Sequence, residues 1–256
     1  VLAGNTVWGH GRSHWLDLVN DTAKSAWQKI GTLHTLPAYY DEITNIPPKL
    51  LGELAYRVSN GRGRARLNQD ASFAENYGDF RTMLVSTSNA SLHAKLSNYK
   101  VDASAEAIRV FEYVAPSNLF NKSDGTVVYR ALMDNYGLAA EPFIRAVMQD
   151  VDAVKTRVQA WVQIIDQLSG VDSNERFWSA APAAVLTAFE ITNQIGLTRV
   201  SIDRLKAWAV ETIQQMRGIV DESMGKPSEV IDRYLREHIN ETLVLTSMGE
   251  NAEGRL

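Results

Sequence analysis

Leu36-Pro37-Ala38-Tyr39-Tyr40-Asp41-Glu42 is the stretch that decides the fold expected from this sequence. An apolar run that ends in two carboxylates is typical of a strand serving phosphoryl transfer, where one carboxylate faces Mg²⁺ and the next faces the attacking water. Asp41 is the candidate metal ligand, and Glu42 is the candidate residue for the water. The same dipeptide is common at solvated strand ends, so the rest of the chain must support this interpretation.

Short apolar runs alternate with helical periodicity from residue 1 to about residue 115. The expected strands are residues 15–18, 36–40, 82–86 and 108–114, with helices or turns between them. Crossover connections of this kind join parallel strands, so the pattern predicts a mainly parallel sheet covered by helices. The expected class of this half is α/β.

The second half of the chain is expected to be helical. A segment rich in Pro, Ser, Asn, Asp and Gly at about residues 115–125 indicates a loop or linker. Apolar residues then recur at steps of three and four over residues 151–168, which predicts one packed helix. Further helices are expected from residue 174 to 195, ending at Gly196, and from residue 201 onward.

Three domains follow from this pattern. Residues 1–120 are expected to form an ATPase-like core, and residues 121–224 a helical lid or bundle. Residues 225–256 are expected to begin a small winged-helix-like segment. No internal repeat is visible, which argues against a solenoid.

Composition limits the classes of function. The 256 residues are 45% hydrophobic and 22% charged, and no apolar run approaches the roughly 20 residues of a membrane span. The absence of cysteine excludes disulfides, thiolate zinc sites and a cysteine nucleophile, and is compatible with the cytosol. Because the formal net charge is -4, any contact with nucleic acid is expected from a local basic cluster.

The best basic cluster lies in Asn60-Gly61-Arg62-Gly63-Arg64-Ala65-Arg66. In an extended chain alternate residues share one face, so the guanidinium groups of Arg62, Arg64 and Arg66 would point together toward phosphate oxygens. A hairpin lining a nucleic-acid channel would use this arrangement. The alternative is a solvated loop whose arginines pair with nearby carboxylates.

A second polar strand end is expected at Ser86-Thr87-Ser88-Asn89, after the apolar residues 82–85. A polar side chain there can sense the γ-phosphate or orient water beside Asp41 and Glu42, and Asn89 is the best placed. Asn89 or Ser88 can also cap the helix that follows.

Two single arginines are further candidates. Arg109 lies inside a strand-like run, where a rigid arginine at a subunit edge could complete a neighbour's ATP site. Arg176 opens a lid helix and could approach the nucleotide. The simpler alternatives are a surface arginine for Arg109, and pairing with Glu175 or Asp172 for Arg176.

The phosphate-binding loop that this chemistry needs is missing. The pattern GxxxxGK[ST] does not occur in the 256 residues. The chain opens with Val1 rather than Met and has no signal-peptide pattern, so it is interpreted as a piece of a longer protein. Residues 1–8 are expected to be the remainder of a helix that follows such a loop.

The ordered blocks LPAYYDEITN, LAYRVSNGRGRARLNQDA, FRTMLVSTSNASLHAKL, EAIRVFEYVAP and NERFWSAAPA resemble a known family. They look like the helicase-like AAA+ ATPases of phages and mobile elements, which are related to superfamily-three and MCM-like motors. The resemblance covers residues 1 to about 225. It implies an α/β P-loop NTPase fold, an αβα sandwich, here truncated at its N-terminus.

The resemblance further implies an ATP-driven DNA helicase that forms a homo-oligomeric ring in the cytoplasm of a bacterial host, with ATP and Mg²⁺ as cofactors. Asp41 and Glu42 match the Walker B pair, with Asp41 at the metal, and Asn89 matches the first sensor. Arg62, Arg64 and Arg66 match the basic hairpin region that precedes this sensor.

The arginine-finger position corresponds to Arg109, and the lid arginine that contacts the nucleotide corresponds to Arg176. Without the P-loop, this piece is expected to bind ATP poorly or not at all. A packaging motor and a non-enzymatic DNA-binding scaffold remain alternative functions.

Overall fold

The described part of the chain is mostly helical. The computed structural model describes residues 2–11, 23–61, 80–99, 104–116, 121–173, 175–223, 231 and 234–236. Of these residues, 69% are helical and 3% lie in strands. The expected αβα sandwich is therefore wrong for the described residues. A pair of three-residue strands is too short to form the central layer of a sandwich, and most helices bury their apolar faces against one another instead.

The elements of the first half are short. They are α1 (Leu2–Trp8), α2 (Ala23–Leu33), β1 (Ala38–Tyr40), a 3₁₀ turn (Ile43–Asn45), α3 (Pro48–Asn60), β2 (Leu84–Ser86), α4 (Leu92–Tyr99) and α5 (Ser104–Ala107).

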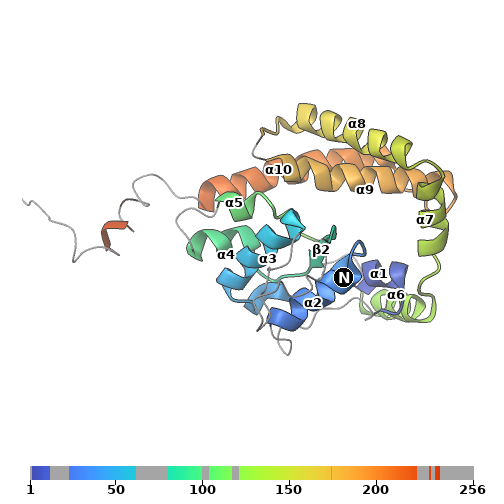
Figure 1. Ribbon diagram of the computed structural model, residues 1–256, viewed down its shortest axis with the longest axis horizontal. Helices are drawn as coiled ribbons and strands as arrows, with labels where there is room; N and C mark the ends of the chain where they lie inside the picture. Colours follow the sequence, from blue (N-terminus) through green and yellow to red (C-terminus); the bar gives the residue numbers. More distant parts are fainter. Residues whose placement is uncertain are drawn as a thin grey trace, which may run out of the picture.

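The second half has longer helices. They are α6 (Lys122–Asp134), α7 (Ala140–Gln149), α8 (Val151–Ser169), α9 (Arg176–Gln194) and α10 (Ile202–Ser223). Figure 1 shows α8 packed on α9 and α10, with α2 to α5 and β2 below these three helices in this view. Helix α7 descends at one end of the three helices toward α6 and α1. None of the described helices combines the length and hydropathy that crossing a bilayer requires.

The two strands pair in parallel and position the polar residues that follow them. Tyr39 is the partner of Val85 and Tyr40 of Ser86. These strands confirm the last three residues of each of the expected strands 36–40 and 82–86. The side chains of β1 are all buried: Ala38 and Tyr40 lie in a core formed with α2, α3 and α4, whereas the ring of Tyr39 lies against Gly4 of α1.

One glycine sets the path of the chain out of α3. Gly61 has a φ of 66°, a left-handed conformation that ends the helix. A Cβ atom at this position would lie 2.5 Å from the carbonyl oxygen of Phe80, which any larger residue would have to displace. Because Phe80 leads into β2, this close approach helps to fix the second strand beside the first.

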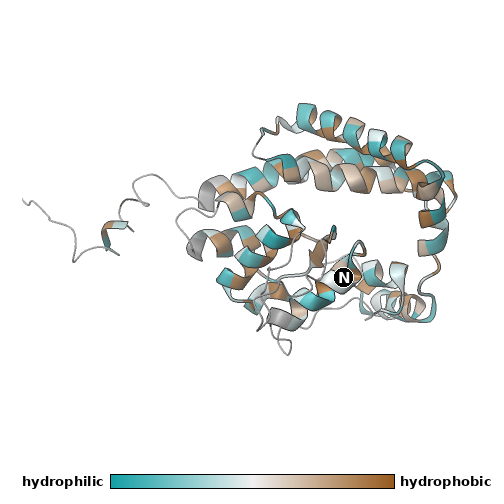
Figure 2. Cartoon of the chain, in the orientation of Figure 1, coloured by the Kyte–Doolittle hydropathy of each residue, from teal (hydrophilic) through white to brown (hydrophobic). Residues whose placement is uncertain are grey.

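The bundle of α8, α9 and α10 has its own core and matches the helices expected there. Its buried members are Trp161, Ile165, Trp178, Ala183, Leu186, Ala209, Ile213, Met216 and Val220. In Figure 2 the outward turns of α8 are mainly hydrophilic, whereas α9 carries more hydrophobic residues. The ends of the expected α8 stripe lie outside the core, since Leu168 is 52% exposed.

The segment 110–116 connects the two halves and is not a strand, so the strand expected at residues 108–114 is wrong. The Val110 carbonyl accepts a hydrogen bond from Trp178 Nε1 at 3.0 Å, and the Glu112 amide lies 3.0 Å from the Met216 sulfur. The Glu112 carboxylate accepts from the amide of Leu92, at 2.8 Å, and thereby caps α4. These backbone and side-chain groups pair with helices, which explains why no third strand forms here.

A buried histidine lies at this junction. His93 packs edge-on against Trp178 with ring centroids 6.1 Å apart, and neither ring nitrogen has a hydrogen-bond partner. Burial lowers the pKa of His93, although the Glu112 carboxylate opposes this effect. The ring is therefore a neutral packing element.

Two further expectations fall outside the described residues. One is the expected strand at residues 15–18. The other is the expected winged-helix-like segment at residues 225–256, of which only residues 231 and 234–236 are described.

Candidate functional site

The candidate site lies where β1 and β2 end. Because the strands are parallel and in register, the residues after each strand emerge at the same edge. Asp41 and Glu42 follow β1, and Thr87, Ser88 and Asn89 follow β2. The structure thus brings together three of the residues expected to act on a nucleotide, namely Asp41, Glu42 and Asn89. We call this group, with Thr87 and Thr44, the strand-end site.

Asp41 is held by a hydroxyl group. Thr87 Oγ1 donates to Asp41 Oδ1 at 2.6 Å. Thr87 Oγ1 also accepts from the Glu42 amide at 3.0 Å. A hydrogen bond to an ionised carboxylate is short and stronger than a neutral one. Asp41 is exposed, and its Oδ2 atom has no partner among the described residues. One carboxylate oxygen is therefore oriented while the other remains available to a ligand.

Glu42 occupies a strained position. Its φ and ψ are 60° and 69°, in the left-handed region that costs a residue with a side chain roughly 1–2 kcal/mol. Asn89 Nδ2 donates to Glu42 Oε2 at 2.5 Å, and the Thr44 amide donates to Oε1 at 3.3 Å. Two neutral donors therefore orient the Glu42 carboxylate without cancelling its charge.

Thr44 connects the two strand ends. Its hydroxyl oxygen accepts from the Asn89 amide at 2.7 Å and lies 3.1 Å from Ser88 Oγ. Its carbonyl oxygen accepts from Lys95 Nζ, which brings an ammonium group of α4 close to the edge. The backbone on both sides of Asn89 is thus fixed relative to Glu42.

The donor set suits a magnesium ion that shares its coordination sphere with phosphate. Mg²⁺ is usually bound through one or two carboxylates, several waters and phosphate oxygens. Asp41 supplies one exposed carboxylate with an available oxygen, and Glu42 a second carboxylate beside it. In the described part of the chain, no cluster of three or more His, Asp or Glu side chains could hold a metal by itself.

Arg109 lies away from this edge and is engaged within the chain. Its guanidinium group lies over the rings of Tyr56, at 4.8 Å, and Phe177, at 5.4 Å. Its Nε donates to Ser59 Oγ at 2.9 Å, and Nη1 donates to the Ala105 carbonyl. Arg109 therefore joins α3 to the start of α9, and these contacts favour an intramolecular role over a finger presented to a neighbouring subunit.

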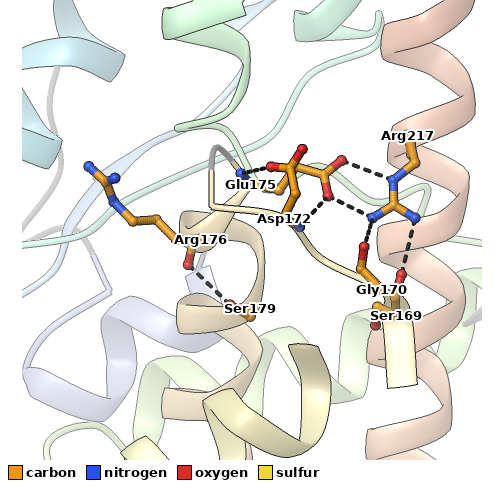
Figure 3. Close-up of polar contacts among 7 residues, drawn as sticks. All are labelled: Ser169, Gly170, Asp172, Glu175, Arg176, Ser179 and Arg217. Atoms are coloured by element: carbon orange, nitrogen blue, oxygen red, sulfur yellow. Dashed lines mark hydrogen bonds and ion pairs between the residues drawn. The ribbon is translucent and has the colours of Figure 1, made fainter. Parts of the chain in front are cut away.

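Arg176 does not pair with the nearby acidic residues. Figure 3 shows its guanidinium group pointing away from Glu175 and Asp172. Its only described polar link in this view is its carbonyl oxygen, which accepts from Ser179 Oγ at 3.1 Å. The side chain is exposed and lies over the ring of Phe177. The structure does not bring Arg176 together with Asp41, Glu42 or Asn89.

Glu175 binds a different arginine. Arg217 of α10 donates to the Glu175 carboxylate from Nε at 2.9 Å and from Nη2 at 2.6 Å (Figure 3). The same guanidinium group also donates to the carbonyls of Ser169 and Gly170. Asp172 and Glu175 also exchange bonds between side chain and amide, at 3.1 and 3.2 Å, as in a capping box. This group fixes the turn between α8 and α9.

The expected DNA-binding arginines, Arg62, Arg64 and Arg66, lie outside the described residues. Sequence reasoning missed Thr87 and Thr44, since isolated threonines carry no spacing signal. It also missed the role of Glu175, although Asp172-Ser173-Asn174-Glu175 has the acidic variant of the capping-box spacing.

No protein-family model, no curated protein and no solved structure matches this chain. The chemical interpretation of the strand-end site therefore depends on its geometry.

Proposed function

We propose that this chain is part of an ATP-driven DNA motor, and that the strand-end site is the carboxylate half of its nucleotide site. One observation carries the proposal: the Glu42 carboxylate, next to Asp41, accepts a hydrogen bond from Asn89, which lies 47 residues further along the chain than Glu42. A solvated Asp-Glu pair at a strand end does not require a matched amide donor. A pair that must position water beside a phosphate does.

Each side chain has a definite task in this proposal. Asp41 and its available oxygen would hold Mg²⁺, which neutralises charge on the phosphates when it is bound. Glu42 would orient the attacking water and accept its proton. Asn89 holds the Glu42 carboxylate in one direction, so the base does not have to be ordered at the moment of reaction.

The proposal requires phosphate contacts from another part of the motor. The 256 residues contain no GxxxxGK[ST] loop, so this chain on its own is expected to hydrolyse ATP poorly or not at all. DNA contact is proposed for Arg62, Arg64 and Arg66 because of their alternate spacing. Assembly into a ring in the cytoplasm, where ATP and DNA are both present, completes the proposal.

The test is Glu42→Gln in the complete natural protein that contains this chain. The substitution keeps the size of the side chain but removes the base and replaces one of its two accepting oxygens with an NH2 group, so ATP turnover should fall by about 100-fold or more. Filter binding should detect DNA affinity close to that of the wild type. Glu53→Gln is the matched control, since Glu53 pairs with Arg57 on α3 and should leave turnover unchanged.

Unchanged turnover in Glu42→Gln would overturn the proposal and leave a DNA-binding scaffold as the interpretation. If turnover is lost as expected, a strand-separation assay distinguishes a helicase from a motor that moves along or packages duplex DNA.

A further inference from the structure

We propose that Thr87 is a positioning residue of the strand-end site, which sets the direction of the Asp41 carboxylate and the backbone of Glu42. This inference depends on the proposed function, because it concerns the same nucleotide site. It starts from the Thr87 hydroxyl, which bonds to both residues of the carboxylate pair.

The hydrogen-bonding capacity of Thr87 is directed toward β1 and its end. A hydroxyl has one proton to donate and two lone pairs. The proton is used on Asp41 Oδ1 at 2.6 Å, and one lone pair accepts from the Glu42 amide at 3.0 Å. The Thr87 amide donates to the Tyr40 carbonyl at 3.3 Å, and its carbonyl accepts from the Ile43 amide at 2.7 Å.

The first consequence concerns the metal ligand. Asp41 is exposed and no other described group restrains its carboxylate, so without Thr87 its side chain would sample several rotamers. Mg²⁺ demands nearly ideal octahedral geometry, and carboxylates bound by an outer partner hold a metal better. Thr87 therefore restricts Asp41 before any ligand arrives.

The second consequence concerns the base. The amides of Glu42 and Ile43 both donate to Thr87, so the strained residue is anchored at its own nitrogen and at the next one. If the hydroxyl bond is lost, Glu42 can relax toward an ordinary backbone conformation. Such relaxation would move its carboxylate away from Asn89.

The experiment compares three variants of the complete natural protein. Thr87→Val keeps the shape of the side chain but removes the hydroxyl, whereas Thr87→Ser keeps the hydroxyl. Thr82→Val is the matched control, because the Thr82 hydroxyl bonds to the Leu36 carbonyl at the other end of the same strand pair. Steady-state kinetics with ATP give kcat, KM and the Mg²⁺ concentration for half-maximal rate.

Thr87→Val should lower kcat by about 10- to 100-fold and raise the Mg²⁺ requirement, with a smaller change in the KM for ATP. Thr87→Ser should stay within about threefold of the wild type, and Thr82→Val should match it. A second readout does not need turnover: electron paramagnetic resonance of Mn²⁺ with ADP should detect weaker Mn²⁺ binding for Thr87→Val only. Thermal unfolding should detect similar losses of stability for the two valine variants.

The outcomes separate the two proposals. A wild-type protein without ATP turnover overturns the proposed function and the role of Thr87 together. Turnover in the wild type with normal kcat and Mn²⁺ binding in Thr87→Val overturns the role of Thr87 alone. Loss of activity in Thr82→Val as large as in Thr87→Val also overturns it, because the effect would then reflect the fold of the strand pair.

Discussion

The strand-end site and the three-helix bundle use the same polar groups in opposite ways. In the bundle, Glu175 is gripped at both oxygens by the Arg217 guanidinium, and its side chain is only 14% exposed. At the strand ends, Glu42 is exposed and is held by a neutral amide and a backbone amide. A guanidinium partner cancels the charge of a carboxylate, whereas neutral donors direct it. The Glu175 carboxylate is therefore neutralised inside the bundle, whereas the Glu42 carboxylate keeps its charge at the surface.

The same contrast holds for the backbone. The bundle helices α8 and α9 are followed by glycines, Gly170 and Gly196, which adopt positive φ at low cost. The strand-end site places Glu42 in that region, where the side chain makes the conformation costly. At Glu42 this strain coincides with a side chain held in one direction by Asn89.

The largest expected effect tests whether the bundle core carries the stability. Trp178→Ala should lower the free energy of unfolding by about 3–5 kcal/mol, because Trp178 is 1% exposed and also bonds to the Val110 carbonyl. Urea unfolding measures the change. Leu168→Ala on α8, where the leucine is 52% exposed, is the control and should cost less than about 1 kcal/mol. Equal losses of unfolding free energy in both variants would contradict the placement of Trp178 in the core and of Leu168 outside it.

The next effect tests the Arg217 contacts. Arg217→Met should cost about 1–3 kcal/mol, because it leaves the partly buried Glu175 carboxylate without its charged partner and uncaps α8. Combining it with Glu175→Gln should cost less than the sum of the two single changes. Additive losses in urea unfolding would mean that the two side chains act independently.

A smaller effect of opposite sign tests the strain at the strand ends. Glu42→Asn should raise the free energy of unfolding by up to about 1 kcal/mol, because asparagine tolerates the left-handed region better. The same variant should lose ATP turnover in the complete protein. Glu53→Asn, within α3, should instead lower stability by about 0.5 kcal/mol. If Glu42→Asn lowers the free energy of unfolding, the backbone conformation of Glu42 does not reduce stability, and the contrast with the glycines of the bundle fails.

The smallest effect is pH-dependent and belongs to the bundle. Hydrogen bonds from Arg157 lower the pKa of Glu190, with a smaller contribution from the Trp161 indole. A carboxyl whose pKa is lower in the folded state adds stability that is full above its unfolded pKa, about 4.3, and is lost as pH falls through the folded value. The contribution should stay below about 1 kcal/mol, since Arg157 is 55% exposed.

Urea unfolding at pH 7 and pH 3 measures this contribution. Glu190→Gln should reduce the loss of stability between these two pH values. Glu211→Gln is the control, because the Glu211 carboxylate accepts from the neutral Gln215 side chain and the substitution should leave the pH dependence unchanged. If Glu190→Gln leaves the pH dependence unchanged, carboxyl groups other than Glu190 cause the loss of stability between pH 7 and pH 3.

The bundle could be predicted from the sequence because its signals are local. Three- and four-residue spacing identified α8, and Gly196 marked the end of α9. The two strands were also predicted, and with them the proximity of Asn89 to Glu42. The sandwich was wrong because its layers depend on long-range pairing, which alternation of apolar residues does not determine.

Residues 108–114 show what a local sequence pattern cannot predict. Their alternation of apolar and polar residues is that of a strand, but Trp178, Met216 and the amides of α4 provide the partners for Val110 and Glu112. Those partners lie up to 104 residues away in sequence. The role of Thr87 was equally invisible, because it depends on the register of β1 against β2.

Glu112 contacts both α10 and the start of α4. Its amide lies against Met216 of α10, and its carboxylate holds the first amide of α4, three residues after Asn89. The backbone and the side chain of Glu112 thus tie α10 to the start of α4, close to the turn that bears Asn89.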